Sequence, residues 1–220
     1  MELHTIDIEF DSEEVLYEYA KHLEGMTFND VLDLGIVPRD GKARSFNPNS
    51  KGNYGILLEE RYFGYKANNS PEPDFPEAGV ELKATCIDAR KGGDVAGERL
   101  SLTMIPFDKE VPEDLYESHL WHKCRRILLV WYIRDKSLER PYDQSIVLVK
   151  LFTPPEADLR IIEADYRLIA KLVREGRAEE LSEGLTTYLG AATKGSTVPG
   201  GTPSVVSSRS YSSTSPKSSS

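Results

Sequence analysis

Apolar residues recur at helical spacing near the N-terminus, within residues 11–24. Side chains three and four positions apart lie on one face of a helix, and an apolar face packs on a core. The residues at these positions are Val15, Leu16, Tyr19, Ala20 and Leu23. Asp11 and Glu14 have the spacing of a capping box, and Gly25 follows as a stop signal. The pattern predicts an amphipathic helix.

Two later stretches, residues 54–63 and 158–175, also predict helices. The apolar residues of the first are Ile56, Leu57 and Leu58. Glu59 and Glu60 follow them, and taken alone they have the pattern of solvated helix charges. The second stretch is longer and stops at Gly176. Its apolar residues are Ile161, Ile162, Leu168, Ile169, Leu172 and Val173.

Alternation between apolar and polar residues predicts a strand over residues 79–87, GVELKATCI. One face would carry Val80, Leu82, Ala84 and Cys86, and the other Glu81, Lys83 and Thr85. The runs RRILLVWYI and SIVLVKLF are continuously apolar, as in strands covered on both faces. ERLSLTMIPF alternates again and is the expected hairpin partner of the first strand. Helices and strands together predict an α/β (α+β) fold.

Turn formers divide these elements. Residues 27–53 begin with a short apolar patch and continue as PRDGKARSFNPNSKGN, which is rich in turn formers and basic residues. This stretch indicates either an ordinary surface loop or a mobile, basic loop that faces DNA. NNSPEPDFPEAG excludes regular structure because its prolines break it. After Gly195 the chain is almost entirely Ser, Thr, Pro and Gly. We therefore expect a folded domain over residues 1–195 and a disordered Ser-rich tail over residues 196–220.

Composition narrows the function classes. The formal net charge of −9 and pI near 5.1 argue against a protein that coats nucleic acid by electrostatics alone. Cys86 and Cys124 lie in apolar runs, which predicts reduced core thiols rather than a disulfide. No apolar run approaches about 18 residues, and the N-terminus lacks the features of a signal peptide. These observations predict a soluble cytoplasmic protein with no membrane partner.

Candidate chemistry gathers where Asp74 is followed seven residues on by Glu81 and then by Lys83. Two carboxylates with a backbone carbonyl can hold Mg²⁺, and a neighbouring lysine can orient water or neutralise a phosphate in phosphodiester hydrolysis. The bare pattern D-x6-E-x-K is weak, because charged residues make up 29% of the chain. The alternative is an edge strand with a salt-bridged polar face.

The residues around this pattern carry a resemblance. KGNYGILLEERYFG and PEPDFPEAGVELKAT resemble the MutH and Sau-type family of GATC-directed endonucleases, within the PD-(D/E)xK nuclease superfamily. The resemblance implies a restriction-endonuclease-like fold, a mixed sheet flanked by helices. Matched by motif, the family's catalytic roles fall on Glu59, Asp74, Glu81 and Lys83, with Asp74 and Glu81 as metal ligands. A further catalytic lysine corresponds to Lys123, with Arg125 as a competing match.

The function implied is a type II site-specific endonuclease that cuts duplex DNA at GATC with Mg²⁺, for which Mn²⁺ could substitute, as a monomer or a DNA-induced dimer. EGRAEELSEGLTTYLGAATKG resembles the Sau-type enzymes in particular. There Lys194 is the candidate for reaching guanine or a phosphate, and Tyr188 is a packing residue. The other DNA-contact candidates are Arg44, Lys51, Lys91 and Arg125.

Two other functions stay open: a MutH-like nicking enzyme of mismatch repair, and a DNA-binding domain with weak or no catalysis. The family continues past TKG into further strands, and the Sau-type enzymes then have a second domain, whereas this chain enters its Ser-rich tail. This departure predicts a truncation, for example by a frameshift, which would impair cleavage. Reading the encoding DNA past codon 195 in all three frames would test it.

Overall fold

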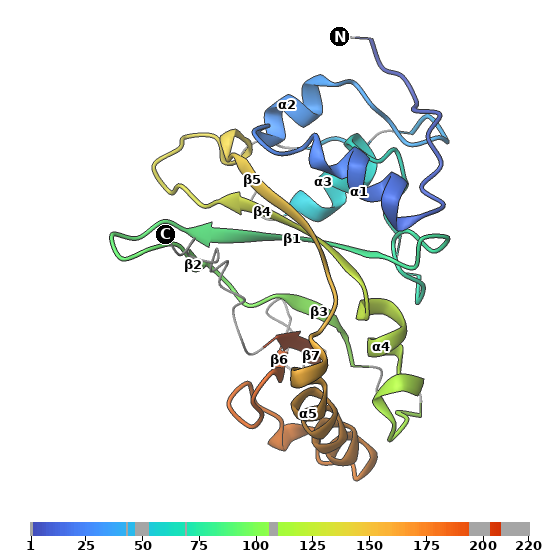
Figure 1. Ribbon diagram of the computed structural model, residues 1–220, viewed down its shortest axis with the longest axis vertical. Helices are drawn as coiled ribbons and strands as arrows, with labels where there is room; N and C mark the ends of the chain where they lie inside the picture. Colours follow the sequence, from blue (N-terminus) through green and yellow to red (C-terminus); the bar gives the residue numbers. More distant parts are fainter. Residues whose placement is uncertain are drawn as a thin grey trace, which may run out of the picture.

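A four-stranded mixed sheet divides the protein into two sides (Figure 1). The strands, in sheet order, are β2 (Val95–Ala96), β1 (Glu81–Asp88), β4 (Ile127–Ile133) and β5 (Ile146–Phe152). β1 and β4 run parallel, and the outer pairs are antiparallel. The computed structural model describes residues 2–42, 44–46, 53–68, 70–105, 110–193 and 203–207.

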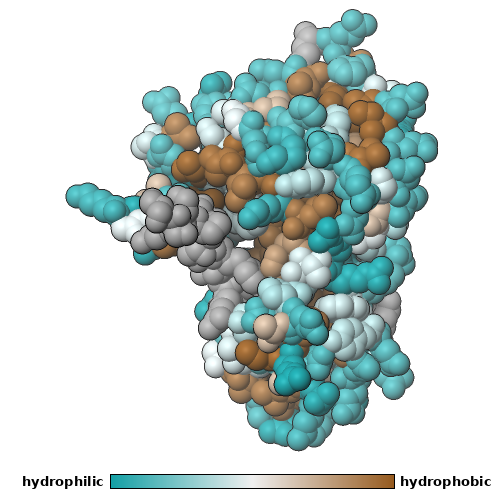
Figure 2. Space-filling view, viewed as in Figure 1, coloured by the Kyte–Doolittle hydropathy of each residue, from teal (hydrophilic) through white to brown (hydrophobic). Residues whose placement is uncertain are grey.

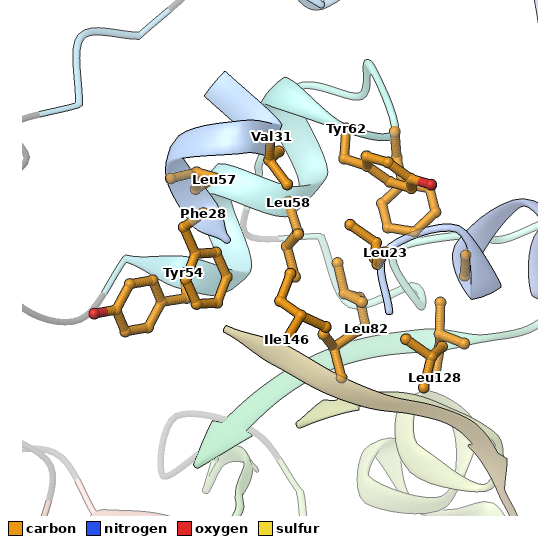
Figure 3. Close-up of a cluster of buried hydrophobic side chains, with 14 of the residues drawn as sticks. Leu23, Phe28, Val31, Tyr54, Leu57, Leu58, Tyr62, Leu82, Leu128 and Ile146 are labelled. Carbon is orange, nitrogen blue, oxygen red and sulfur yellow. The ribbon is translucent and has the colours of Figure 1, made fainter. Parts of the chain in front are cut away.

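Three helices cover one face of this sheet: α1 (Glu13–Lys21), α2 (Phe28–Asp33) and α3 (Tyr54–Arg61) (Figure 1). Their apolar side chains form one core with that face of the sheet. Leu58 of α3 points toward the sheet, where Leu82 and Ile146 meet it (Figure 3). The helices predicted over residues 11–24 and 54–63 are therefore confirmed.

The beginnings of two of these helices differ from the prediction. The N-cap of α1 is Ser12 rather than Asp11, because the Ser12 hydroxyl accepts the Val15 N–H at 3.4 Å. α2 lies in the stretch that we expected to be a loop. Thr27 and Asp30 form a reciprocal capping box there, which starts a helix that has only six residues.

The other side of the sheet is covered by α4 (His119–Cys124), α5 (Glu156–Arg174) and a second, three-stranded sheet (Figure 1). The strands of that sheet, in order, are β3 (Ser101–Met104), β7 (Pro203–Ser207) and β6 (Leu189–Thr193). Short 3₁₀ turns lie at η1 (Leu115–Glu117), η2 (Pro141–Asp143) and η3 (Ala178–Glu180). Polar residues predominate on the surface around α5 (Figure 2). The helix predicted over residues 158–175 is confirmed as α5.

The neighbours of β1 correct two expectations. Its hairpin partner is β2, whereas β3, from the ERLSLTMIPF run, joins the second sheet. β1 is also no edge strand, since it pairs with both β2 and β4. Gly97 directly follows β2 and donates its N–H to the Cys86 carbonyl of β1, and a Cβ there would lie 2.6 Å from the Cys86 sulfur. The tight approach needs glycine.

The Ser-rich stretch contributes one strand, which differs from the disorder expected for residues 196–220. Residues 203–207 form β7 and pair with β3 and β6. The sequence PSVVS supports this because valine favours strands. The remaining tail residues lie outside the described part of the chain. None of the described helices is both long and apolar enough to cross a membrane.

Candidate active site

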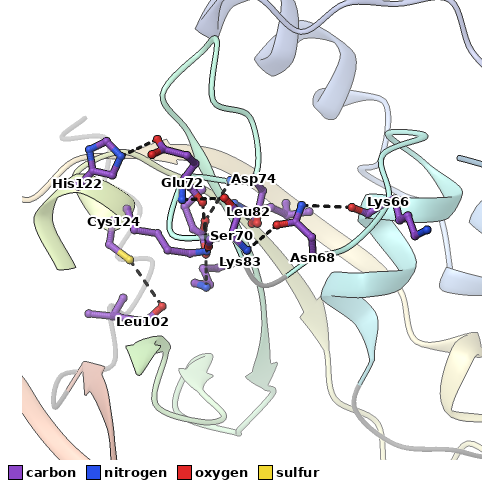
Figure 4. Close-up of polar contacts among 12 residues, drawn as sticks. Lys66, Asn68, Ser70, Glu72, Asp74, Leu82, Lys83, Leu102, His122 and Cys124 are labelled. Carbon is purple, nitrogen blue, oxygen red and sulfur yellow. Dashed lines mark hydrogen bonds and ion pairs between the residues drawn. The ribbon is translucent and has the colours of Figure 1, made fainter. Parts of the chain in front are cut away.

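Asp74 is held beside the start of β1 by a closed turn. Phe75 and Val80 exchange backbone hydrogen bonds of 2.9 and 3.1 Å, and both side chains are buried. The Asp74 N–H donates to Glu81 Oε2 at 3.2 Å, and the Leu82 N–H donates to Asp74 Oδ2 at 3.0 Å (Figure 4). Gly79 closes the turn with φ +66°, a conformation that favours glycine. The two carboxylates predicted from the sequence therefore lie together.

Glu81 is the most enclosed member of the group, with 1% of its surface exposed. The Lys83 ammonium lies 2.6 Å from its Oε1, and the Lys123 ammonium lies 3.5 Å from its Oε2. The period of a strand places Glu81 and Lys83 on one face. Lys123 reaches the same carboxylate from α4. The structure thus brings together Asp74, Glu81, Lys83 and Lys123.

Burial and charge set the protonation of this pair. Burial raises the pKa of Glu81, while the two lysines counteract it in part. Burial is also the largest influence on Lys83 and lowers its pKa, but the Glu81 and Asp74 carboxylates outweigh it and leave that pKa raised. In the metal-free protein Lys83 is therefore a cation and a hydrogen-bond donor rather than a base.

Glu59 belongs to the same electrostatic group. Its pKa is raised to about 8, first by burial and then by the negative charges of Asp74 and Glu81. Glu59 lies in the last turns of α3, which packs on the sheet next to β1. It is thus not the solvated helix charge that its pattern alone indicated. A third acidic group stands close enough to feel the predicted metal ligands.

α4 also fixes the segment that carries Asp74. Lys123 donates to the carbonyls of Ser70 and Glu72, at 3.3 and 3.4 Å (Figure 4). His122 Nε2 lies 2.7 Å from the Glu72 carboxylate. No sequence spacing pointed to His122 and Glu72, because fifty residues separate them. Lys123 therefore anchors the loop as well as facing Glu81.

Arg125, the competing match for the further lysine, stands apart from the carboxylates. It is exposed, and a Cβ on Gly79 would lie 3.7 Å from its guanidinium. No contact with Asp74 or Glu81 is found for Arg125 among the described residues. Lys123 occupies the place beside Glu81 instead.

The remaining DNA-contact candidates lie elsewhere. Arg44 is exposed and lies 3.5 Å from the carboxylate of Glu60. Glu60 is 2% exposed, which corrects its expected solvation. Lys91 is exposed in the turn between β1 and β2. Lys51 and Lys194 lie outside the described residues.

The donor set agrees with a hard cation. Asp74 and Glu81 offer carboxylate oxygens, the ligands that Mg²⁺ prefers. Burial first, and neighbouring carboxylates after it, raise the pKa values of Glu59 and Glu81, and a divalent cation would favour their charged forms. Within the described residues, no three side chains of the His, Cys, Asp and Glu types group closely enough to hold a metal. Further ligands would have to be backbone carbonyls or waters.

A neutral thiol completes the surroundings of Lys83. Burial raises the pKa of Cys124 to about 12, so the side chain stays uncharged beside the ammonium. Cys86 is buried on the opposite face, and both cysteines are free thiols, as predicted. The Cys124 thiol gives the site an apolar boundary rather than a reactive group.

Comparison with known proteins relates this geometry to two kinds of enzyme. The sequence model of the family described as "DNA mismatch repair enzyme MutH" matches residues 63–165. The type II restriction enzyme Sau3AI of Staphylococcus aureus is 38% identical over 149 residues, 66% of this chain. The DNA mismatch repair protein MutH of Serratia proteamaculans is 30% identical over 178 residues, 78% of this chain. MutH of Pectobacterium atrosepticum is 29% identical over 184 residues.

The relatives differ in how much of their own length is matched. The alignment covers 30% of the Staphylococcus enzyme, but 72% and 73% of the Serratia and Pectobacterium proteins. The matched family region begins at Phe63 and ends in α5, so it includes Asp74, Glu81, Lys83 and Lys123. The residues that the turn and β1 bring together thus lie within the part shared with these proteins.

Proposed function

This chain belongs to the MutH family, within the PD-(D/E)xK nuclease superfamily, and on that premise we propose that it is a Mg²⁺-dependent endonuclease that hydrolyses duplex DNA at GATC. One observation carries the proposal. The carboxylate of Glu81 is almost fully buried. It accepts the backbone N–H of Asp74 and lies beside the ammonium groups of Lys83 and Lys123. Titratable groups with shifted pKa values and specific charged partners are candidates for a functional site.

The roles follow from these contacts. Asp74 and Glu81 would hold Mg²⁺, which when bound lowers the pKa of water and polarises a phosphoryl oxygen. Lys83, being protonated, would donate to the attacking water or to the phosphate and stabilise the charge that builds on its oxygens. The pKa of Glu59, about 8 in the metal-free protein, would be lowered by bound Mg²⁺, and the ionised Glu59 would then take up the proton that the water loses. Lys123 would hold the loop that carries Asp74 in place beside Glu81.

DNA would be held by local basic groups, because the overall charge of −9 repels phosphates. We propose Arg44, Lys51, Lys91, Arg125 and Lys194 for these contacts, with Lys194 in sequence reading. The preference for GATC rests on the likeness of LTTYLGAATKG to the Sau-type enzymes. We further propose that residues 1–195 act as the catalytic domain, in the cytoplasm, as a monomer or a DNA-induced dimer.

Nicking in mismatch repair is the second candidate, and one observation favours it. The chain covers over 70% of the MutH proteins but under a third of the restriction enzyme. The higher identity to the restriction enzyme, 38%, favours the first candidate. A restriction enzyme would cut both strands of GATC, whereas a MutH-like enzyme would nick one strand and respond to adenine methylation.

Plasmid cleavage tests the proposal. The full chain is incubated with Mg²⁺ and a supercoiled plasmid that contains GATC, beside a plasmid from which every GATC is removed. Lys83→Ala should slow cleavage by about 10³-fold, because a charge-stabilising donor is lost. Lys171→Ala, which removes an exposed lysine of α5, should leave the rate unchanged.

Each outcome discriminates. Equal cleavage by the wild type and Lys83→Ala would refute the assigned site. Cleavage of both plasmids alike would refute GATC specificity. No cleavage by the wild type would refute the enzyme and favour a binding-only domain, which a gel shift with the same DNA would then measure.

A further inference from the structure

Asp165 of α5 is a buried carboxylate that the catalytic scheme does not use. It is 7% exposed. Three consecutive backbone N–H groups donate to it: Thr187 at 3.1 Å to each oxygen, Tyr188 at 2.5 Å and Leu189 at 3.0 Å to Oδ2. A buried carboxylate requires such partners, because an unsatisfied one is strongly destabilising.

This arrangement constrains the backbone of residues 187–189. Successive N–H groups of an extended strand point in opposite directions, so three of them converge on one anion only where the chain turns. The turn is tight, since a Cβ on Gly190 would lie 3.2 Å from Glu183. α5 makes a second contact with the same segment, where the Tyr188 hydroxyl donates to Asp158 at 2.9 Å. α5 therefore determines how the chain enters β6.

The segment lies on the catalytic side of the central sheet. Tyr188 and Leu189 line an apolar cavity together with Cys124 and Ile127. Cys124 is also the thiol that interacts with Lys83, and Ile127 pairs in register with Glu81. Through Ile127, this cavity connects the turn at residues 187–189 with the strand that pairs with β1 at Glu81. DNA bound at Glu81 and Lys83 would lie on this side.

We propose that Asp165 is a positioning residue for DNA reading. Its carboxylate fixes the backbone of residues 187–189 and thereby sets the position of β6 relative to bound DNA. It does not contact the reacting atoms. This inference rests on the proposed endonuclease function. It assigns to Asp165 the discrimination between DNA sequences and leaves the chemical step to Glu81 and Lys83.

Asp165→Asn is the direct test. Both oxygens of Asp165 accept backbone N–H groups, and the substitution replaces one of these oxygens with an NH₂ group, which can only donate. Asp158→Asn is the matched control on the same helix, since its amide oxygen can still accept the Tyr188 hydroxyl. Initial rates are measured with Mg²⁺ on a GATC duplex and on a duplex with one base pair changed. We expect Asp165→Asn to reduce the ratio of the two rates by about tenfold and to leave the rate on the changed duplex within about threefold.

Two further measurements guard against a variant that fails to fold. Thermal unfolding shows whether Asp165→Asn is folded, and if it is not, Asp165→Glu, which keeps the carboxylate but shifts it, takes its place. Hydrogen exchange should quicken at the amides of residues 187–189. An equal fall of both rates, an unchanged ratio or unchanged exchange would each overturn the inference. A wild type without preference for GATC would overturn the proposed function as well, whereas wild-type preference retained in the variant would overturn only the role of Asp165.

Discussion

The two faces of β1 are equally buried but chemically opposite. Leu82 and Cys86 on one face are 4% and 0% exposed, and Glu81 and Thr85 on the other are 1% and 6% exposed. The apolar face joins the aromatic core under α1, α2 and α3. The polar face meets α4, which supplies Lys123 to Glu81. Alternation of apolar and polar residues along a strand therefore does not imply that the polar face is exposed to solvent.

The difference between the faces separates stability from chemistry. Burial of apolar side chains stabilises the fold by about 25 cal/mol per Å². A buried ion pair gains little net stability, because desolvation offsets the attraction. The charges around Glu81 therefore agree better with a functional site, and burial together with the neighbouring Asp74 and Glu81 raises the pKa of Glu59 to about 8. Substitutions on the two faces should consequently fail in different ways.

The largest effect is expected on the polar face. Glu81→Gln keeps the shape of the side chain but removes the charge shared by Lys83 and Lys123. Cleavage of GATC plasmid should slow by about 10³-fold, which is about 4 kcal/mol in the activation barrier. The melting temperature should fall, because the two ammonium groups lose their buried partner, but the variant should remain folded. Glu77→Gln, in the same turn but exposed, is the control and should cleave normally. Loss of folding in Glu81→Gln would show that the polar face is structural.

The neighbouring residue tests the other face. Leu82→Ala leaves a cavity in the core and should lower the free energy of unfolding by about 3 kcal/mol. The backbone hydrogen bond from Leu82 to Asp74 is retained. The folded variant should therefore cleave near the wild-type rate at low temperature. Denaturant unfolding measures the stability, and plasmid cleavage measures the activity. A variant that loses activity but keeps its stability would contradict the division between the faces.

These two faces also show what sequence can predict. Alternation over residues 79–87 was enough to place Glu81 and Lys83 together, because strand geometry fixes that relation locally. The contact of Lys123 with Glu81 depends on a helix 40 residues away, so only the resemblance pointed to it. α2 was missed because its signal is one capping box rather than apolar periodicity. Partners of β3 and β7 are set by long-range pairing, which no local pattern encodes.

Gly97 tests the contact between β1 and the end of β2, with a smaller expected effect. A Cβ there would lie 2.6 Å from Cys86 Sγ, 2.9 Å from Asp88 Oδ1 and 3.0 Å from the Arg134 guanidinium. Gly97→Ala should destabilise the protein by about 1–3 kcal/mol through overpacking. Gly92→Ala, where a Cβ meets nothing within 4 Å, is the matched control. Equal unfolding midpoints for the two variants would show that β2 can move away from β1.

The last expected effect is a pH dependence of stability that Glu59 of α3 imposes. The pKa of Glu59 is raised from 4.5 to about 8, so the folded, metal-free protein holds this proton more tightly than the unfolded chain. The stability that the proton contributes is present at low pH and is lost as the pH rises from about 4.5 to about 8. Glu59→Gln cannot lose a proton, so its free energy of unfolding should depend less steeply on pH in this window.

Denaturant unfolding in EDTA at several pH values between 5 and 9 measures this difference. The wild type and Glu59→Gln should diverge progressively as the pH rises, with the variant the more stable at the alkaline end. Glu77→Gln should follow the wild type, because it removes an exposed carboxylate of the same turn. Parallel curves for the wild type and Glu59→Gln would mean that Glu59 does not share the charge of Asp74 and Glu81. The buried polar face would then end at β1 and α4, without α3.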